Sequence, residues 1–388
     1  MIAKYFIWLL LLTVAPQWWI DRIYCRHYTP WKRFLCWLPT GIVACYTVYL
    51  FICHNGMPAN HLLTDLWFLV LGVVVIPQAI YSLCLLAKWG WCRARHRRVT
   101  GRNWIASLLA CASAAAYLYG FFWGFGQLRV KHITLAYDQL PEAFDGYRIV
   151  HISDLHVGTF QGWRSWMLNR DIDSINAQKA DVILFTGDLQ NFSPQEISEN
   201  KVELSRLKAP DGIISVLGNH DYGKYIARDE TEKKTIEQAI IKEEEGLGWT
   251  LLRSSHHAIR RGKDSIVIAG EEYDTSLDNP YKHPVSVSLD GIKPNSFLIM
   301  LEHDPEAWPS RTLPDTHASL QLSGHTHGGH IDLLGARSTR LASSLDYGLH
   351  EREGRYLYTT RGLGGVIPLR IGAWAEIVVI TLKKTSKT

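Results

Sequence analysis

Three histidines and three glycines fall within eight residues of this sequence, SGHTHGGH, at positions 323–330. A helix is disfavoured there, because glycine in a helix interior costs about 1 kcal/mol relative to alanine. A buried strand is also disfavoured, because each ring nitrogen of a buried histidine needs a hydrogen-bond partner. We therefore expect a loop that holds His325, His327 and His330 against a centre that takes nitrogen ligands.

Four other apolar stretches also end in Asp, Asn or His residues. Asp154 and His156 follow YRIVHIS (147–153), Asp188 follows DVILFT (181–186), Asn219, His220 and Asp221 follow GIISVL (212–217), and His303 follows SFLIML (296–301). Residues i and i+2 of an extended chain point to the same side, so Asp154 and His156 can face one point. Ligands of open α/β sheets bind beyond the carboxyl ends of the strands. We therefore expect the ends of these four stretches, together with the end of the stretch 318–323, to form a metal site at one edge of a sheet.

Seven of these side chains are candidate metal ligands. They are Asp154, His156, Asp188, Asn219, His303, His325 and His327. Seven ligands are too many for one ion that must also hold water and substrate, but they suit two ions that share a carboxylate. Two ions about 3.5–4 Å apart can clamp the attacking and leaving oxygens of a displacement at phosphorus. Mixed Asp, Asn and His ligands favour Mn, Fe or Zn over Ca.

The elements that would carry these residues alternate between strands and helices. The runs 264–270, 355–360 and 376–382 are also typical of strands. The ranges 163–178 and about 230–245 are typical of helices, the second ending at Gly246. Strands with intervening helices predict an α/β fold.

Five motifs in this order, SDLH, TGDL, GNHD, LEHDP and SGHTHGG, resemble those of the calcineurin-like metallophosphoesterases. The sequence is most similar to bacterial membrane-linked phosphodiesterases of that superfamily. The resemblance covers about residues 147–382 and says nothing of residues 1–125. It implies an α/β domain in which two mixed β-sheets are sandwiched by helices.

The resemblance also implies a role for each residue of the site. One ion would bind Asp154, His156, Asp188 and His327, and the other Asp188, Asn219, His303 and His325. Asp188 would bridge the ions, and a hydroxide between them would attack phosphorus. His220 would donate a proton to the leaving group or steady the transition state, with Asp221 orienting it.

Each short motif has a plainer explanation when it is taken alone. Asp154 and His156 could belong to a turn with a helix cap, and GNHD to a simple turn. His151 lies within a strand and is more typical of a core histidine. His330 stands where the family commonly has glutamine, so we expect it to contact a ligand or the substrate. Arg361 and Arg370 could meet a phosphate or form salt bridges.

The first 125 residues differ sharply from the rest of the chain. They hold 11 of the 41 Lys and Arg residues, two acidic residues and all seven cysteines. Four apolar runs, at roughly 5–20, 34–53, 62–87 and 104–125, approach or reach the length of about 20 residues that a membrane span needs. Tryptophans near the ends of the runs fit the aromatic belt of membrane proteins. We predict a transmembrane region of about four helices over residues 1–126 and a catalytic domain over 127–388.

Two alternatives for this region are disfavoured. A cleaved signal peptide would need small residues after the first run, where the sequence has Pro16-Gln17-Trp18-Trp19. A soluble helical bundle would need a polar face on each helix, which the four runs lack.

Positive charge predicts the orientation. The first loop has Arg22, Arg26, Lys32 and Arg33, and the third has Lys88, Arg93, Arg95, Arg97, Arg98 and Arg102. The second loop, HNGMPAN, has neither Lys nor Arg. Lys and Arg near helix ends mark the cytoplasmic side. We therefore expect a protein of the bacterial inner membrane whose catalytic domain faces the periplasm or the exterior.

These observations predict a membrane-anchored, two-metal enzyme that hydrolyses a phosphodiester, a pyrophosphate or a phosphomonoester. Lipid-linked phosphates are attractive substrates because the anchor keeps the site near the bilayer. Two alternatives are a UDP-2,3-diacylglucosamine-type pyrophosphatase of lipid A synthesis and a membrane scaffold without catalysis. Nucleic-acid binding is disfavoured, because residues 126–388 hold 35 acidic against 30 basic residues. The sequence leaves the oligomeric state open.

Overall fold

The computed structural model describes residues 2–54, 61–99, 101, 103–227, 229–273, 285 and 287–385. The chain forms two compact units, Met1–Gly124 and Phe125–Thr388. The boundary that the sequence predicts, between residues 126 and 127, lies two residues further along. The predicted orientation also depends on Arg102 and on residues 55–60. These residues lie outside the described residues.

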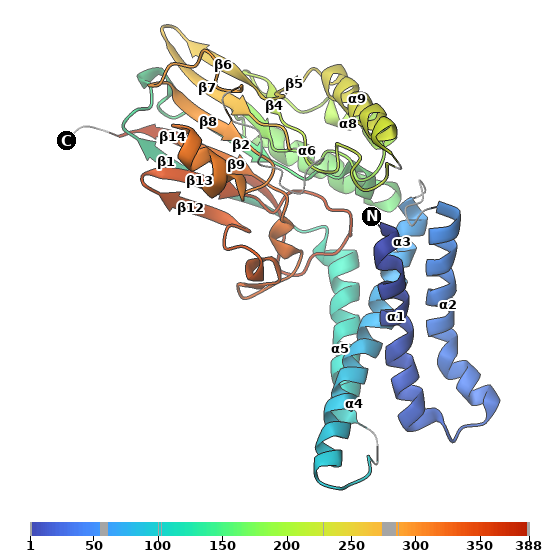
Figure 1. Ribbon diagram of the computed structural model, residues 1–388. Helices are drawn as coiled ribbons and strands as arrows, with labels where there is room; N and C mark the ends of the chain where they lie inside the picture. Colours follow the sequence, from blue (N-terminus) through green and yellow to red (C-terminus); the bar gives the residue numbers. More distant parts are fainter. Residues whose placement is uncertain are drawn as a thin grey trace. The chain divides into compact units, whose positions relative to one another are not determined.

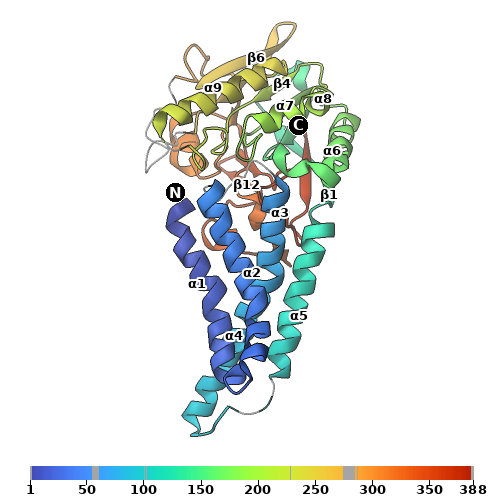
Figure 2. The same ribbon diagram turned by 90° about the vertical axis from the view of Figure 1, so that its right-hand side faces the viewer.

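The first unit is helical (Figures 1 and 2). Its α-helices are α1 (Ile2–Ile20), α2 (Pro30–His54), α3 (His61–Val70), α4 (Ile76–Ala94) and α5 (Trp104–Tyr119). A π-helical turn, Leu71–Val75, joins α3 to α4. Large apolar side chains point outward from these helices: Ile105 is 71% exposed and Leu108 is 70% exposed. Apolar surface of this kind is unfavourable in water and suits a lipid environment.

Three segments among the described residues are long and apolar enough to cross a membrane: Pro30–Cys53, His61–Ala94 and Trp104–Gly124. The sequence predicted about four. The remaining run, at about 5–20, forms α1, but its uninterrupted apolar stretch, residues 5–15, lies between Lys4 and Pro16-Gln17. This stretch is shorter than the ~20 residues of a full span. That α1 crosses the membrane therefore stays a prediction.

The second unit contains two six-stranded mixed sheets. The first sheet has the order β1 (Leu128–Tyr137), β14 (Ala375–Lys384), β2 (Arg148–Ile152), β3 (Val182–Phe185), β4 (Ile213–Ser215) and β5 (Thr250–Leu251). The second has the order β12 (Gly348–Arg352), β13 (Arg355–Thr359), β9 (Leu320–Ser323), β8 (Phe297–Leu301), β7 (Asp264–Gly270) and β6 (Ser255–Arg261). A separate hairpin is formed by β10 (Asp332–Leu333) and β11 (Ala336–Arg337).

Alternation along the strands builds the layers. In β3, Val182 and Leu184 face the core between the two sheets, whereas Ile183 and Phe185 face the opposite side. That opposite face is covered by the helices α6 (Ser165–Ala177), α7 (Gln195–Glu199), α8 (Lys201–Leu204) and α9 (Glu230–Gly246) (Figure 2). A last short helix, α10, spans Leu313–Asp315.

Each strand that the sequence predicted is present, as are the helices over 163–178 and 230–245. Six strands were not expected: β1, β5, β6, β10, β11 and β12. The strands β5, β10 and β11 have only two residues each, and β6 and β12 are largely polar and exposed along one side. The sequence predicted that the five polar strand ends share one edge of a single sheet. This prediction is wrong, because the strands belong to two sheets. β2, β3 and β4 belong to the first sheet, and β8 and β9 to the second.

Candidate metal centre

Five loops bring the predicted residues together between the carboxyl ends of the two sheets. Backbone hydrogen bonds join neighbouring loops of each sheet: the Asp154 N–H donates to the Gly187 carbonyl at 2.8 Å. The Gly324 N–H donates to the His303 carbonyl at 3.0 Å. The His325 N–H reaches the Asp154 carboxylate at 3.0 Å, which ties the second sheet to the first.

The backbone at these positions has an unusual conformation. The φ angles of Asp154, His156, Asp188, His325 and His327 lie between 45° and 73°. Positive φ is uncommon for residues other than glycine, and such residues gather at functional sites, where surrounding structure holds them. The loops therefore aim these side chains at a cost in backbone strain.

Two glycines allow the loops to approach the carboxylates. A Cβ on Gly218 would lie 2.3 Å from Asp188 Oδ1, and a Cβ on Gly324 would lie 2.2 Å from Asp154 Oδ2. Both distances are far below van der Waals contact. Glycine at these two positions is thus required by close approach.

Asp154, His156 and His327 form one cluster, called here the Asp154 cluster. Their candidate ligand atoms lie within 4.8 Å of one another. His327 Nε2 is 3.5 Å from Asp154 Oδ1, and the His156 and His327 rings stack with centroids 5.2 Å apart. His156 and Asp154 are completely buried.

Asp188, Asn219, His303 and His325 form the second cluster, called here the His303 cluster. His303 Nε2 lies 3.2 Å from Asp188 Oδ2 and 3.0 Å from Asn219 Oδ1. His325 Nδ1 lies 2.7 Å from the same Asn219 oxygen. Asp188 Oδ2 is also 3.6 Å from His156 Nε2, so this carboxylate lies between the two clusters.

The donor atoms fit divalent metal ions. His156 Nδ1 lies 3.1 Å from the Gln190 carbonyl and His303 Nδ1 lies 2.6 Å from the Thr186 carbonyl, which directs each Nε2 toward the carboxylates. Metal-binding histidines are commonly oriented by such bonds from the other nitrogen. Among the described residues, the buried His156 Nε2 has no hydrogen-bond partner. A buried lone pair without a donor, surrounded by carboxylates, is what a bound cation would satisfy.

Burial and charge set the protonation of the two clusters. Burial lowers the pKa of His156 to about 3 and that of His325 to about 4, so both imidazoles are neutral at pH 7. Burial alone would lower the pKa of His303 too, but the Asp188 and Asp154 carboxylates raise it to about 10. Burial alone would raise the pKa of Asp188, whereas the nearby imidazoles, His303 foremost, hold it well below its usual range.

His220 lies beside the shared carboxylate. Its backbone N–H donates to Asp188 Oδ1 at 2.8 Å, and its ring lies 4.8 Å from that of His156. His220 Nδ1 is 2.7 Å from the Asn191 carbonyl oxygen. A carbonyl only accepts, so Nδ1 carries a proton and Nε2 is the nitrogen left for chemistry.

Asp221 has a different neighbour from the one expected. The sequence predicted that it orients His220, but the Asn191 carbonyl bonds that ring instead. The buried Asp221 carboxylate accepts hydrogen bonds at 2.8 Å from the backbone N–H groups of Asp188 and Gly218. Asp221 therefore fixes two of the loops.

Two aromatic residues beside the centre were not predicted. The Tyr225 hydroxyl accepts a hydrogen bond from Asn219 Nδ2 at 2.9 Å, and its ring lies 4.5 Å from that of His220. The Tyr273 ring lies 6.2 Å from that of His303. Tyr225 could have been suspected from its place six residues after Asn219, whereas Tyr273 follows β7, whose end has neither Asp nor His.

The structure also shows the contacts of the other candidate residues, His330, Arg361 and Arg370. The His330 ring stacks on that of His327 at 4.6 Å, so it contacts a predicted ligand. Arg361 pairs with Asp332, and the buried Arg370 donates to backbone carbonyls, including that of Gly364 at 2.6 Å. The two arginines thus hold loops near the centre.

His151 is fully buried, with Nε2 at 2.9 Å from the Thr186 hydroxyl. His151 therefore lies in the core, which agrees with its interpretation as a core histidine.

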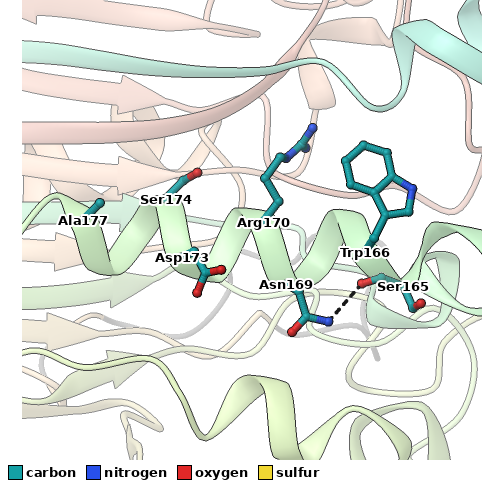
Figure 3. Close-up of a pocket in the computed structure, with 7 residues that line it drawn as sticks. All are labelled: Ser165, Trp166, Asn169, Arg170, Asp173, Ser174 and Ala177. Atoms are coloured by element: carbon teal, nitrogen blue, oxygen red, sulfur yellow. Dashed lines mark hydrogen bonds between the residues drawn. The ribbon is translucent and has the colours of Figure 1, made fainter.

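Figure 3 shows an open depression along one face of α6. It is lined by Ser165, Trp166, Asn169, Arg170, Asp173, Ser174 and Ala177. These residues all come from one helix, and the nine residues predicted for the site lie elsewhere. The guanidinium of Arg170 lies 5.3 Å from the centre of the Trp166 ring. The depression is therefore distinct from the candidate metal centre.

Comparison with known proteins identifies the family. Residues 147–329 match the calcineurin-like phosphoesterase family. These residues belong to the calcineurin-like phosphoesterase family, and the resemblance of the five motifs within them is thereby confirmed.

Three relatives illustrate the match. The chain is 29% identical to the metallophosphoesterase YkuE of Bacillus subtilis over 75% of this chain and 100% of that protein. It is 28% identical to a transmembrane protein with metallophosphoesterase domain of Danio rerio, over 84% of this chain and 74% of that protein. It is 26% identical to the UDP-2,3-diacylglucosamine pyrophosphatase LpxG of Chlamydia muridarum, over 62% of this chain and 86% of that protein.

Proposed function

We propose that this protein is a membrane-anchored phosphoester hydrolase that works with two divalent metal ions. The observation that carries the proposal is the position of the Asp188 carboxylate between two clusters of nitrogen and oxygen ligands. Asp154, His156, Asp188 and His327 would hold one ion, and Asp188, Asn219, His303 and His325 the other. Mn, Fe and Zn all suit this donor set.

The chain's own residues have separate tasks in this proposal. The bound ions would supply Lewis-acid chemistry at phosphorus. His220 lies beside Asp188, and its Nε2 can hold a proton for the departing oxygen while the Asn191 carbonyl keeps the ring in place. Asp221 keeps the Asp188 loop and the GNHD loop in register through their backbone N–H groups.

We favour a phosphodiester or pyrophosphate that is carried by a lipid, with a phosphomonoester as a further option. Three candidate spans support a bilayer as the protein's surroundings. A substrate confined to the same membrane would meet the centre far more often than a dilute soluble one. A catalytic domain outside the cytoplasm, as the basic loops predict, would then act on phosphoesters of the outer leaflet.

A second candidate is a UDP-2,3-diacylglucosamine-type pyrophosphatase, which the similarity to LpxG favours. That substrate is cytosolic, so the orientation of the chain separates the two candidates. An alkaline phosphatase fused to the C-terminus should be active if the catalytic domain is outside. An inactive fusion, with the domain protected from protease in spheroplasts, would favour the UDP-linked substrate. A scaffold without catalysis is disfavoured because all seven predicted ligands and His220 are present and lie close together.

The experiment that tests the proposal is a substrate panel on the full-length protein in detergent with added Mn²⁺. The panel contains generic diesters, monoesters, nucleotide pyrophosphates and lipid phosphates. We expect metal-dependent hydrolysis of at least one class, with a preference for a lipid-linked phosphoester. If protein that has bound its metal hydrolyses no substrate of the panel, the proposal is contradicted. That result would favour the alternative of a membrane scaffold without catalysis.

A further inference from the structure

A small hairpin follows the metal-binding loop directly. β10 and β11 are joined by a two-residue turn, Leu334–Gly335, and the hairpin begins two residues after His330. The φ angles of Leu334 and Gly335 are 56° and 91°, the pattern of a type I′ turn. Asn, Asp and Gly are the residues that suit such turns, and a leucine with positive φ is an outlier. The conformation of the turn therefore does not explain why a leucine occupies this position.

The tip of this hairpin is strongly apolar and projects into the surroundings. Leu334 is 108% exposed, Leu333 is 61% exposed, and Leu341, four residues after β11, is 92% exposed. Three leucines this exposed within nine residues are costly in water, because each fully buried leucine gains substantial free energy by leaving it. Clustered apolar surface of this kind marks an interaction site.

The base of the hairpin is held firmly, so the tip is not a loose loop. Asp332 accepts a hydrogen bond from the Gly335 N–H at 2.7 Å and pairs with Arg361. Arg337 forms two bonds, of 2.8 and 2.9 Å, with the buried carboxylate of Asp346. The apolar tip is thus presented on a fixed support.

The hairpin lies at the end of the α/β unit where its chain begins. The Asp332 N–H donates to the Ile371 carbonyl at 2.8 Å, and four residues later the Ala375 N–H donates to the Gln127 carbonyl at 3.0 Å. Gln127 follows Gly124, the last residue of a candidate span, by three residues, which reach at most about 11 Å. This end of the α/β unit is therefore the one at which the chain arrives from a candidate span.

We propose that the Leu333–Leu334 hairpin inserts its apolar tip into the surface of the lipid bilayer and holds the metal centre at the level of lipid phosphates. The inference rests on the membrane anchoring of the proposed function. The rings of His327 and His330 stack, and the hairpin begins at Asp332, two residues after His330. Insertion of the tip would therefore bring bilayer phosphoesters to the metal centre. The exposed Arg340, beside Leu341, adds the positive charge that anionic headgroups attract.

The direct test is photo-crosslinking of the full-length protein. Benzoylphenylalanine is placed at position 334 and, as a matched control, at position 202, because Val202 on α8 is 76% exposed. Both proteins are reconstituted in vesicles of phosphatidylglycerol and phosphatidylethanolamine, irradiated, and examined for lipid adducts by mass spectrometry. We expect adducts at 334 at least about tenfold more abundant than at 202. Equal yields at the two positions, or crosslinks between two chains, would overturn the proposal.

A second variant, Leu334→Asn, separates this inference from the proposed function. Asparagine suits a positive φ in a type I′ turn, so the hairpin should fold at least as well. Hydrolysis of a phosphoester embedded in vesicles should fall about tenfold, the order expected for losing one buried leucine, while that of a soluble nitrophenyl ester stays unchanged. An equal fall with both substrates would contradict membrane insertion. If the parent protein hydrolyses neither substrate, the proposed function fails, whereas the crosslinking experiment still decides the inference.

Discussion

The two clusters of the centre differ in how they balance charge. In the Asp154 cluster, burial lowers the pKa of His156 to about 3 and that of His327 well below its usual value. In the His303 cluster, the neighbouring carboxylates overcome burial and raise the pKa of His303 to about 10. At pH 7 without metal, the first cluster thus offers neutral imidazoles, whereas the second holds a protonated one.

This difference teaches that the two ion positions need not fill in the same way. A ligand that is already neutral can bind a cation without losing a proton, whereas His303 must first release one. The Asp188 carboxylate is close to His156 and to His303, so it links the two positions.

Asp188→Asn should have the largest effect, because one change weakens both ion positions. We expect hydrolysis to be nearly abolished and the metal content to fall for both ions, measured by elemental mass spectrometry alongside turnover. Asp173→Asn on the surface of α6 makes the same chemical change away from the centre and should alter neither quantity. A variant at position 188 that keeps both ions and near-normal turnover would refute the shared carboxylate.

His220→Ala should keep the metal in both clusters and slow hydrolysis by roughly 10²–10⁴-fold, the usual range for a positioned acid or base. The loss should be smaller with a nitrophenolate leaving group, which needs no proton. Rates for a series of leaving groups measure this. An equal loss for every leaving group would make His220 an electrostatic or structural residue instead.

The pH dependence of metal binding should differ between the clusters. Because the pKa of His303 is raised to about 10, loading the His303 cluster displaces one proton, and its affinity should rise about tenfold per pH unit between pH 6.5 and 8.5. The Asp154 cluster should change little over this range, because its imidazoles are already neutral. Titration calorimetry with Mn²⁺ at several pH values would resolve the two slopes. Identical slopes would contradict the difference between the clusters.

Tyr225→Phe should have the smallest effect and touch only the His303 cluster. It removes the hydroxyl that accepts from Asn219 Nδ2 and so loosens the amide whose oxygen faces His303 and His325. We expect metal affinity in that cluster to fall about tenfold, as is common for groups that orient a ligand, with the Asp154 cluster unchanged. Loss of metal from both clusters would mean that Tyr225 supports the loop as a whole.

Much of the site was predictable because chemistry at metal ions restricts residue types. Asp154, His156 and Asp188 follow buried apolar strands, and such strands are recognisable from their composition. The family resemblance added the grouping of ligands into two ions. The division of the strand ends between two sheets was not readable from the strands themselves, because strand pairing is decided by contacts distant in sequence.

Other features depend on the backbone and were beyond prediction from the sequence. The carbonyls of Gln190 and Asn191 hold His156 and His220, and any residue type could supply a carbonyl. The exposure of Leu334 likewise emerges only when the hairpin is folded, since leucine in a sequence suggests a core position.

In the proposed function, one chain holds two ions and uses both for hydrolysis. The most direct measurement is the number of Mn²⁺ ions per full-length chain, followed as the metal is restored to chelator-treated protein while hydrolysis is recorded. We predict two ions per chain and hydrolysis that appears as the second ion binds. Saturation at one ion, or hydrolysis that persists after the chelator has removed the metal, would contradict the account.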